Sequence, residues 1–179
     1  MRFTFEPLRR TDLELMARWR GAPHVLRWWP GPCDLASIAQ EYETLVDGSD
    51  TTRAFVCSAD GRPIGYAQAY RLADEPAWQA TIAEAIGVVH AAGIDYFIGE
   101  PDSVGRGIGS KMIADFVATV WQTLADVSSV VVAVQQENAG SWKALERAGF
   151  DRVWAGHLDS DDPSDQGPAY VYILARPPE

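Results

Sequence analysis

The feature that most constrains the fold is a short apolar segment that leads into a glycine-rich turn and then into a long helical pattern. Residues 93–99 read GIDYFIG, residues 104–111 read VGRGIGSK, and apolar residues at helical spacing follow. Glycines at alternate positions let the backbone approach a ligand closely, and the first N–H groups of a helix lack acceptors within it. A phosphate can accept hydrogen bonds from these groups. The segment therefore predicts a strand, an anion-binding turn and a helix that together hold a phosphorylated cofactor.

The turn matches neither of two well-known phosphate-binding patterns. No Gly-Lys-Ser/Thr sequence ends it, as a P-loop requires, and its glycine spacing is one residue tighter than that of the dinucleotide-binding fingerprint. On the loop alone, an ordinary glycine-rich turn before a helix therefore remains open as an alternative.

The charge of the chain bears on its partners. Its 179 residues, 47% of them hydrophobic, suffice for a single domain spanning residues 1–179. The 15 Lys and Arg against 25 Asp and Glu give a formal net charge of −10, which argues against a nucleic-acid partner. A cationic small molecule suits this charge, although solubility alone also accounts for it.

The cysteines, the histidines and the N-terminus indicate the cellular setting. Cys33 and Cys57 match no metal-ligand or redox spacing, and the three histidines are scattered, so we expect no metal and no covalent nucleophile. The N-terminus alternates apolar and polar residues, unlike a signal peptide, and no apolar segment is long enough to span a membrane. We expect a cytoplasmic protein with reduced thiols and no membrane partner.

Hydrophobic periodicity predicts an α/β (α+β) fold with a mixed central sheet of about seven strands flanked by about four helices. Residues 73–92 show only weak helical periodicity, so we expect an inserted loop with about one helical turn there. Asp60 and Gly61 predict a hairpin turn, because both residues tolerate positive φ angles. The predicted strands cover residues 2–8, 53–58, 63–72, 94–99, 130–134, 150–158 and 169–175, and the predicted helices begin after Asp12 and after Asp34 and cover residues 111–124 and 138–148.

Two groups of residues are candidates for a site. Asp95 stands between apolar neighbours within a predicted strand, where a carboxylate is disfavoured unless a partner or a function offsets its desolvation. Such a setting raises the pKa of an acid and makes it a better base, but a side chain that points to solvent is an equally open alternative. The pair Trp28-Trp29 and the alternation of Tyr66, Gln68 and Tyr70 suit stacking on sugars or cations, or simple core packing. We expect the acidic segment 159–165 to be a solvated surface turn, with attraction of a polycation as an open alternative.

The element order, the turn at 104–109 and the segment from Asn138 to Phe150 together resemble the GCN5-related N-acetyltransferases (GNAT superfamily) over nearly the whole chain. Within that superfamily, Trp28-Trp29 and Gly93-Ile94-Asp95, with residues 65–68 and 167–169, look like the aminoglycoside 6'-N-acetyltransferases that cause antibiotic resistance. The paired tryptophans and the Gly-Ile-Asp sequence are the more specific of these matches.

The resemblance implies acetyl-CoA as cofactor and direct acetyl transfer to the 6'-amine of an aminoglycoside in a ternary complex. It places Asp95 at the position of the general base, which takes a proton from the substrate ammonium because only the neutral amine can attack a thioester. The cofactor-binding residues that it implies are Phe97, Ile98, Val104, Gly105, Arg106, Gly107, Ile108, Gly109, Ser110, Lys111 and Asn138. The substrate-binding residues that it implies are Trp28, Tyr66, Gln68, Tyr70, Glu84 and Asp95, with Glu100 and Asp102 as further acidic candidates.

The chain departs from the family pattern at two positions. Val104 replaces the usual Arg or Gln, which removes a side chain but leaves the backbone turn. Leu145 replaces a tyrosine that many members use to protonate the leaving thiolate. Water, Tyr96 or Tyr170 could serve instead, or the thiolate could leave unprotonated.

Two other functions stay open on the sequence. The chain could acetylate a different amine, such as a siderophore lysine or a polyamine, or it could be an acyl-CoA-binding sensor without catalysis. A monomer and a homodimer fit the sequence equally well.

Overall fold

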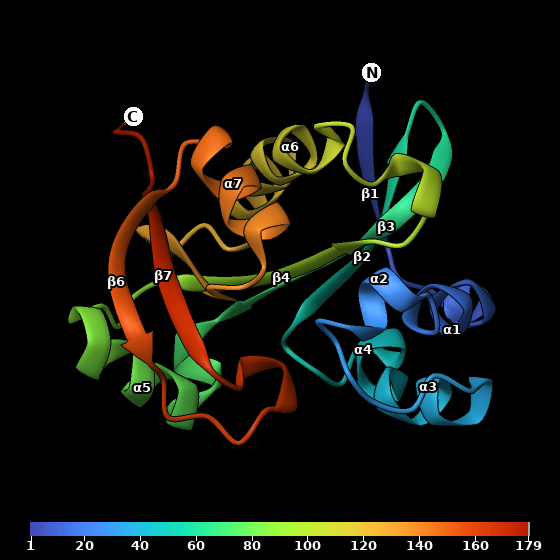
Figure 1. Ribbon diagram of the computed structural model, residues 1–179. Coiled ribbons are helices and arrows are strands. Elements are labelled where there is room, and N and C mark those ends of the chain that lie inside the picture. Colours follow the sequence, from blue (N-terminus) through green and yellow to red (C-terminus); the bar gives the residue numbers. More distant parts are fainter. Residues whose placement is uncertain (179) are drawn as a thin grey trace.

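A computed structural model describes residues 1–178. Its framework is a seven-stranded mixed sheet with the strand order β1-β2-β3-β4-β5-β7-β6 (Figure 1). Neighbouring strands are antiparallel except β4 and β5, which run parallel. The strands are β1 (Phe3–Pro7), β2 (Arg53–Ala59), β3 (Arg62–Arg71), β4 (Ala92–Ile98), β5 (Ser129–Gln135), β6 (Asp151–His157) and β7 (Pro168–Ala175).

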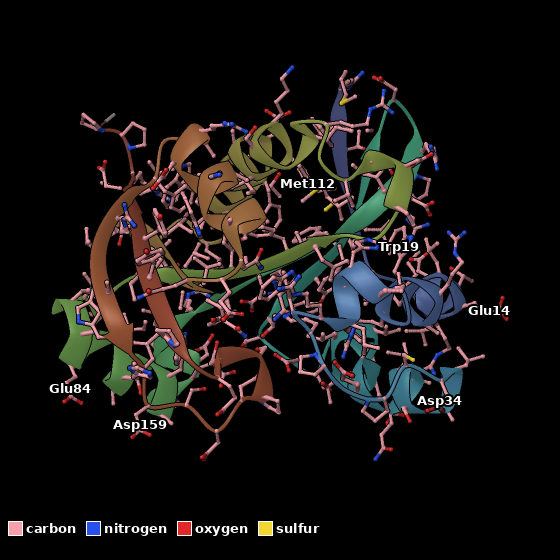
Figure 2. All side chains as sticks on the ribbon, in the orientation of Figure 1. Glu14, Trp19, Asp34, Glu84, Met112 and Asp159 are labelled. Atoms are coloured by element: carbon pink, nitrogen blue, oxygen red, sulfur yellow. The ribbon has the colours of Figure 1, made fainter. Side chains whose placement is uncertain are left out.

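Helices cover both faces of the sheet. On one face α6 and α7 bury a core with β4 and β5, and on the other face α1 and α3 cover β2 and β3 while α5 covers β5 and β7 (Figure 1). Met112 of α6 and Trp19 of α1, each 1% exposed, lie in the cores on opposite faces (Figure 2). The α-helices of the described part of the chain are α1 (Leu13–Arg20), α2 (Pro23–Leu26), α3 (Leu35–Glu41), α4 (Glu43–Asp47), α5 (Pro76–Ile86), α6 (Ile108–Thr123) and α7 (Ala139–Arg147).

The structure confirms the predicted α/β fold and the seven strands. The hairpin between β2 and β3 turns at Asp60 and Gly61, which have φ angles of 49° and 82°. The side chain of Asp34 accepts a hydrogen bond from the backbone N–H of Ser37, as the predicted N-cap of α3 requires. No helix among residues 1–178 is long and apolar enough to cross a membrane.

The prediction of about four helices is too low, and the inserted loop predicted at 73–92 is wrong. This segment holds the eleven-residue helix α5, which begins at Pro76 and ends before Gly87 with a left-handed φ of 70°. The periodicity of α5 is weak because Ile82 is its one fully buried residue. The segment 24–33 also contains the end of a short helix, α2.

The feature that positions the site is the separation of β4 from β5. The two parallel strands pair only at Ala92 with Val130 and at Gly93 with Val131, and both strands continue for several residues beyond this point. Strands that stay parallel but lose their hydrogen bonds leave a gap in the sheet, and the gap opens next to Asp95 and Tyr96.

Candidate active site

A cavity of about 580 Å³ opens where β4 and β5 separate. Its wall takes residues 94–98 of β4, residues 132–135 of β5, the glycine-rich turn, the start of α7 and the segment after α2. Side chains of successive strand residues point to opposite faces of a sheet. The cavity is lined by successive residues of β4, and it therefore reaches both faces of the sheet.

The glycine-rich turn forms one end of this cavity. Gly105 and Gly107 have φ angles of 75° and 72°, and Gly107 is the N-cap of the sixteen-residue helix α6. The first turn of α6 carries no acidic residue. Lys143 and Arg147 of α7 line the same cavity. Free helix N–H groups beside two cationic side chains make this end suitable for a polyphosphate.

The structure brings most of the predicted cofactor residues together at the cavity. Those that line it are Phe97, Ile98, Val104, Gly105, Gly107, Gly109, Ser110 and Asn138. Three others belong to the same segment without lining the cavity. Arg106 donates to the backbone carbonyl of Asp102, Ile108 is buried in the core, and Lys111 is exposed.

Asp95 lines the cavity and is held by a chain of hydrogen bonds from β3. The Tyr66 hydroxyl donates to Gln68 Oε1 over 2.7 Å, and Gln68 Nε2 donates to Asp95 Oδ2 over 2.8 Å. Burial raises the pKa of Asp95 to about 6, although the Gln68 hydrogen bond lowers it and the Asp165 charge raises it further. A carboxyl with this pKa is ionised at neutral pH and can accept a proton from an ammonium group.

Four predicted substrate residues do not line the cavity. Tyr66 is fully buried with its ring stacked on Phe97, and Tyr70 packs so closely on Gly93 that no Cβ would fit there. Both residues, like Gln68, belong to β3, which pairs with β4 on the side away from β5. The strand β4 therefore separates them from the gap. Glu84 lies exposed on the outer side of α5 (Figure 2). The residues on β3 therefore support the cavity wall and do not form it.

Two tryptophans and Asp165, a residue of the acidic segment 159–165, also line the cavity. Trp28 and Trp29 both line the cavity, and the Trp29 ring meets Phe97 edge-on with centroids 4.9 Å apart. Asp165 is half-buried in the cavity wall, and burial raises its pKa. The solvated-turn expectation is therefore wrong for this part of the acidic segment.

Two side-chain hydrogen bonds hold the segment 160–165 in place, one from β5 and one within the segment itself. Gln135 Nε2 donates to the carbonyl of Ser164 over 2.5 Å, and Ser160 Oγ donates to Asp165 Oδ2 over 2.7 Å. No local sequence pattern predicts these hydrogen bonds. The first joins residues that are distant in the chain, and the second depends on the shape of the turn.

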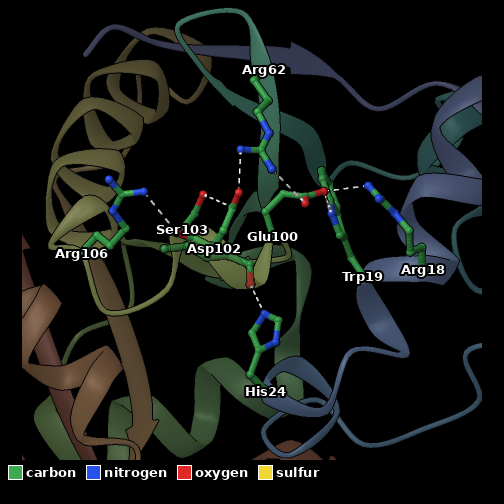
Figure 3. Close-up of polar contacts among 9 residues, drawn as sticks. Arg18, Trp19, His24, Arg62, Glu100, Asp102, Ser103 and Arg106 are labelled. Carbon is green, nitrogen blue, oxygen red and sulfur yellow. Dashed lines mark hydrogen bonds and ion pairs between the residues drawn. The ribbon is translucent and has the colours of Figure 1, made fainter.

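Glu100 and Asp102 belong to an ion-pair network outside the cavity (Figure 3). Glu100 accepts from Arg18 over 2.7 Å and from Trp19 Nε1 over 2.8 Å, and Arg62 bridges Glu100 and Asp102. These carboxylates are already paired, which makes them poor ligands for a cationic substrate. The network ties the end of β4 and the glycine-rich turn to α1 and β3.

An anion-binding helix start, a gap between parallel strands and a carboxyl of raised pKa define a site for group transfer from a phosphorylated donor. Residues 9–158 match the family model described as an acetyltransferase (GNAT) domain, and the chain belongs to this family. It is 26% identical over 169 residues to the aminoglycoside N(6')-acetyltransferase type 1 of Klebsiella pneumoniae, covering 92% of this chain and 79% of that protein. A protein of the same name from Serratia marcescens matches with the same values.

The fold is also similar to solved structures. The aminoglycoside acetyltransferase AAC(6')-Ib in complex with coenzyme A and kanamycin superposes with a TM-score of 0.77 at 23% identity, over 98% of this chain and 95% of that chain. Among residues 1–178, no group of three or more His, Cys, Asp or Glu side chains could hold a metal ion.

Proposed function

We propose that this protein transfers the acetyl group of acetyl-CoA to the 6'-amino group of an aminoglycoside, directly and in a ternary complex. The observation that carries the proposal is that Asp95, with a pKa near 6, shares one continuous cavity with the anion-binding start of α6. The curated relatives named aminoglycoside N(6')-acetyltransferases support the substrate class.

The described residues fit the acetyl donor. The backbone N–H groups at Gly107–Ser110 suit the pyrophosphate, and Lys143 and Arg147 add positive charge beside them. The gap between β4 and β5 offers unpaired backbone groups to the pantetheine amides. When bound, acetyl-CoA supplies an activated thioester carbonyl for attack by an amine.

The other side of the cavity fits a cationic sugar. Asp95 and Asp165 place two carboxylates in the wall, and Trp28 adds an aromatic surface. Charge-assisted hydrogen bonds to ammonium groups are stronger than neutral ones, and the net charge of −10 attracts a polycation from solution. Asp95 removes a proton from the 6'-ammonium, either directly or through a water, and the free amine can then attack the thioester.

The substitution Asp95→Asn tests the role of Asp95 as base. Asparagine has the same shape and can still accept the hydrogen bond of Gln68, but it cannot take a proton. We expect turnover with kanamycin to fall by about 10²- to 10⁴-fold, while the acetyl-CoA affinity measured by calorimetry stays within about twofold of wild type. Turnover at the wild-type level would show that Asp95 is not the base, and loss of acetyl-CoA binding would place it in the cofactor site.

Asp102→Asn provides the matched control. It also removes one carboxylate near the end of β4, but Asp102 pairs with Arg62 outside the cavity. We expect this variant to keep wild-type turnover. If the wild-type protein binds acetyl-CoA but acetylates no amine, the sensor function is correct and the proposed transfer is wrong.

A further inference from the structure

Protonation of the leaving thiolate within the cavity requires a donor there, and the helix position at which the family resemblance places one is Leu145. Leu145 has no polar atom in its side chain and is fully buried in the core between the sheet and α6. A thiolate is disfavoured in a buried setting, since burial raises the pKa of thiols. A hydroxyl elsewhere in the wall would meet this need.

Among the described residues, Tyr96 is the one tyrosine that lines the cavity. It follows Asp95 in β4, so the two side chains leave the strand on opposite faces and still border the same gap. The neighbours of Asp95 come from the face of α1 to α5, whereas Tyr96 packs with the core under α6 and α7. A carbonyl in the gap would thus have a base on one side and a hydroxyl on the other.

The Tyr96 hydroxyl is held against the start of α7. It lies 2.9 Å from Ser141 Oγ, and the backbone N–H of Ser141 donates to the capping side chain of Asn138. Ser141 also lines the cavity, and Leu145 lies one helical turn after it on the same face of α7. The Tyr96 and Ser141 hydroxyls therefore reach the same helix face as Leu145, one turn closer to the helix start.

We propose that the Tyr96 hydroxyl, positioned by Ser141, donates the proton that the sulfur of coenzyme A takes up as it leaves. This inference rests on the proposed acetyl transfer. As the amine nitrogen forms its bond to the carbonyl carbon, the bond between that carbon and sulfur breaks and its electron pair goes to sulfur. The Tyr96 proton moves to sulfur, and the tyrosinate regains a proton from the Ser141 hydroxyl, which is refilled from water. The nitrogen loses two protons in all, and Asp95 passes both to water. Because the sulfur takes up one proton that water replaces, the reaction releases one net proton.

The proposed role requires that Tyr96 carry its proton before the transfer. Burial raises the pKa of Tyr96 above its usual value, although the Ser141 hydrogen bond opposes this effect. The hydroxyl is therefore protonated over the whole neutral range and is present as a donor in every turnover.

The other tyrosines on this side of the sheet are engaged elsewhere. The ring of Tyr170 packs against the Arg152 guanidinium at 4.4 Å and meets Trp142 edge-on. The Tyr172 hydroxyl donates to Glu146 over 2.9 Å. Neither residue lines the cavity. Tyr170→Phe is therefore a matched control, because it removes one hydroxyl from the same region outside the cavity.

The first test compares turnover. We expect Tyr96→Phe to lower kcat with kanamycin by about 10²-fold and to change the KM for acetyl-CoA by less than about twofold, since only the leaving step loses its donor. Ser141→Ala should lower kcat by a smaller factor, and Tyr170→Phe should leave it unchanged. A Tyr96→Phe enzyme with wild-type kcat overturns the proposal while leaving the acetyltransferase function intact.

The second test measures binding and needs no turnover. Desulfo-coenzyme A lacks the sulfur, so a donor aimed at sulfur contributes to the affinity of coenzyme A and not to that of the analogue. We expect wild type to bind coenzyme A about fivefold more tightly than desulfo-coenzyme A and Tyr96→Phe to bind the two equally. The same ratio in both proteins would overturn the proposal. If the wild-type protein has no turnover, the proposed function fails, and the binding ratio still decides whether Tyr96 meets the sulfur.

Discussion

Asp95 titrates close to the pH at which a base must act, because burial disfavours its charge while the Gln68 amide favours it. The free enzyme must hold Asp95 ionised in order to take a proton. We therefore expect kcat/KM for kanamycin to rise with pH through about 6 and to level off above it, as measured over pH 5 to 8. The same pH profile for Asp95→Asn should lack this rise, which is the acid limb of the profile.

The Gln68 amide sets where this limb lies. Gln68→Leu removes a hydrogen bond that stabilises the ionised carboxylate, so the pKa of Asp95 should rise and the acid limb should move to higher pH. Tyr66→Phe removes the next hydroxyl along the chain and keeps the bond from Gln68 to Asp95, so it should leave the limb in place. An unmoved limb in Gln68→Leu would show that another group produces it.

The raised pKa of Asp95 also costs stability. The folded state holds its proton up to about pH 6, whereas the unfolded chain loses it near pH 4, so the stability contributed by this group falls as pH rises between these values. Asp95→Asn should therefore raise the free energy of unfolding by about 2 kcal/mol more at pH 8 than at pH 4. Urea unfolding at the two pH values measures this difference.

A matched carboxylate should behave in the opposite way. Arg62 lowers the pKa of Asp102, so Asp102→Asn should give no gain in the free energy of unfolding at pH 8. Equal gains in the two variants would mean that the effect comes from net charge and not from the burial of Asp95.

The turn before α6 can be tested as an element. Gly107 has a left-handed φ and no atom within 4 Å of a Cβ placed there, and the same is true of Gly61 in the hairpin between β2 and β3. Gly107→Ala and Gly61→Ala should each cost about 1 to 2 kcal/mol of stability from backbone strain. Only Gly107→Ala should also weaken acetyl-CoA binding, measured by calorimetry, because a backbone shift that relieves this strain moves the N–H groups of the anion-binding turn. Equal affinities in the two variants would argue against that turn as the phosphate site.

The elements differ in how far the sequence predicts them. The strand that contains Asp95 and the helix α6 carry strong signals, since one has a compact apolar run and the other has a clear stripe of buried residues. The helix α5 lacks such a stripe because it buries only Ile82 fully. Its end signals were nevertheless present in Pro76 at the start and Gly87 after the end, and they could have identified it.

The cavity as a whole is a property of the tertiary structure. Asp95 and the glycine-rich turn could be identified because their chemistry and spacing are local. Asp165, Lys143 and Arg147 could not, since each depends on where its element packs relative to the gap between β4 and β5. The same limit explains why Tyr66 was predicted to meet substrate. Its alternation with Gln68 predicts that the two side chains share one face of their strand. It does not show that β4 lies between that strand and the cavity.

The net charge of the molecule leads to a prediction about salt. A formal charge of −10 attracts a polycationic substrate over distances that salt screens, with a Debye length of about 10 Å at 0.1 M. We expect the KM for kanamycin to rise several-fold between about 20 mM and about 300 mM NaCl, while kcat changes by less than about twofold because it describes the bound complex. A KM independent of salt would mean that the surface charge serves only solubility.

The central claim is acetyl transfer from acetyl-CoA to a 6'-amine, and thiol release by the purified protein tests it most directly. The matched substrates are kanamycin, which carries a 6'-amino group, and an aminoglycoside with a hydroxyl group at the same position. The account predicts acetyl-CoA-dependent thiol release with kanamycin and none above background with the 6'-hydroxyl compound. Release with neither compound, or equal release with both, would contradict it.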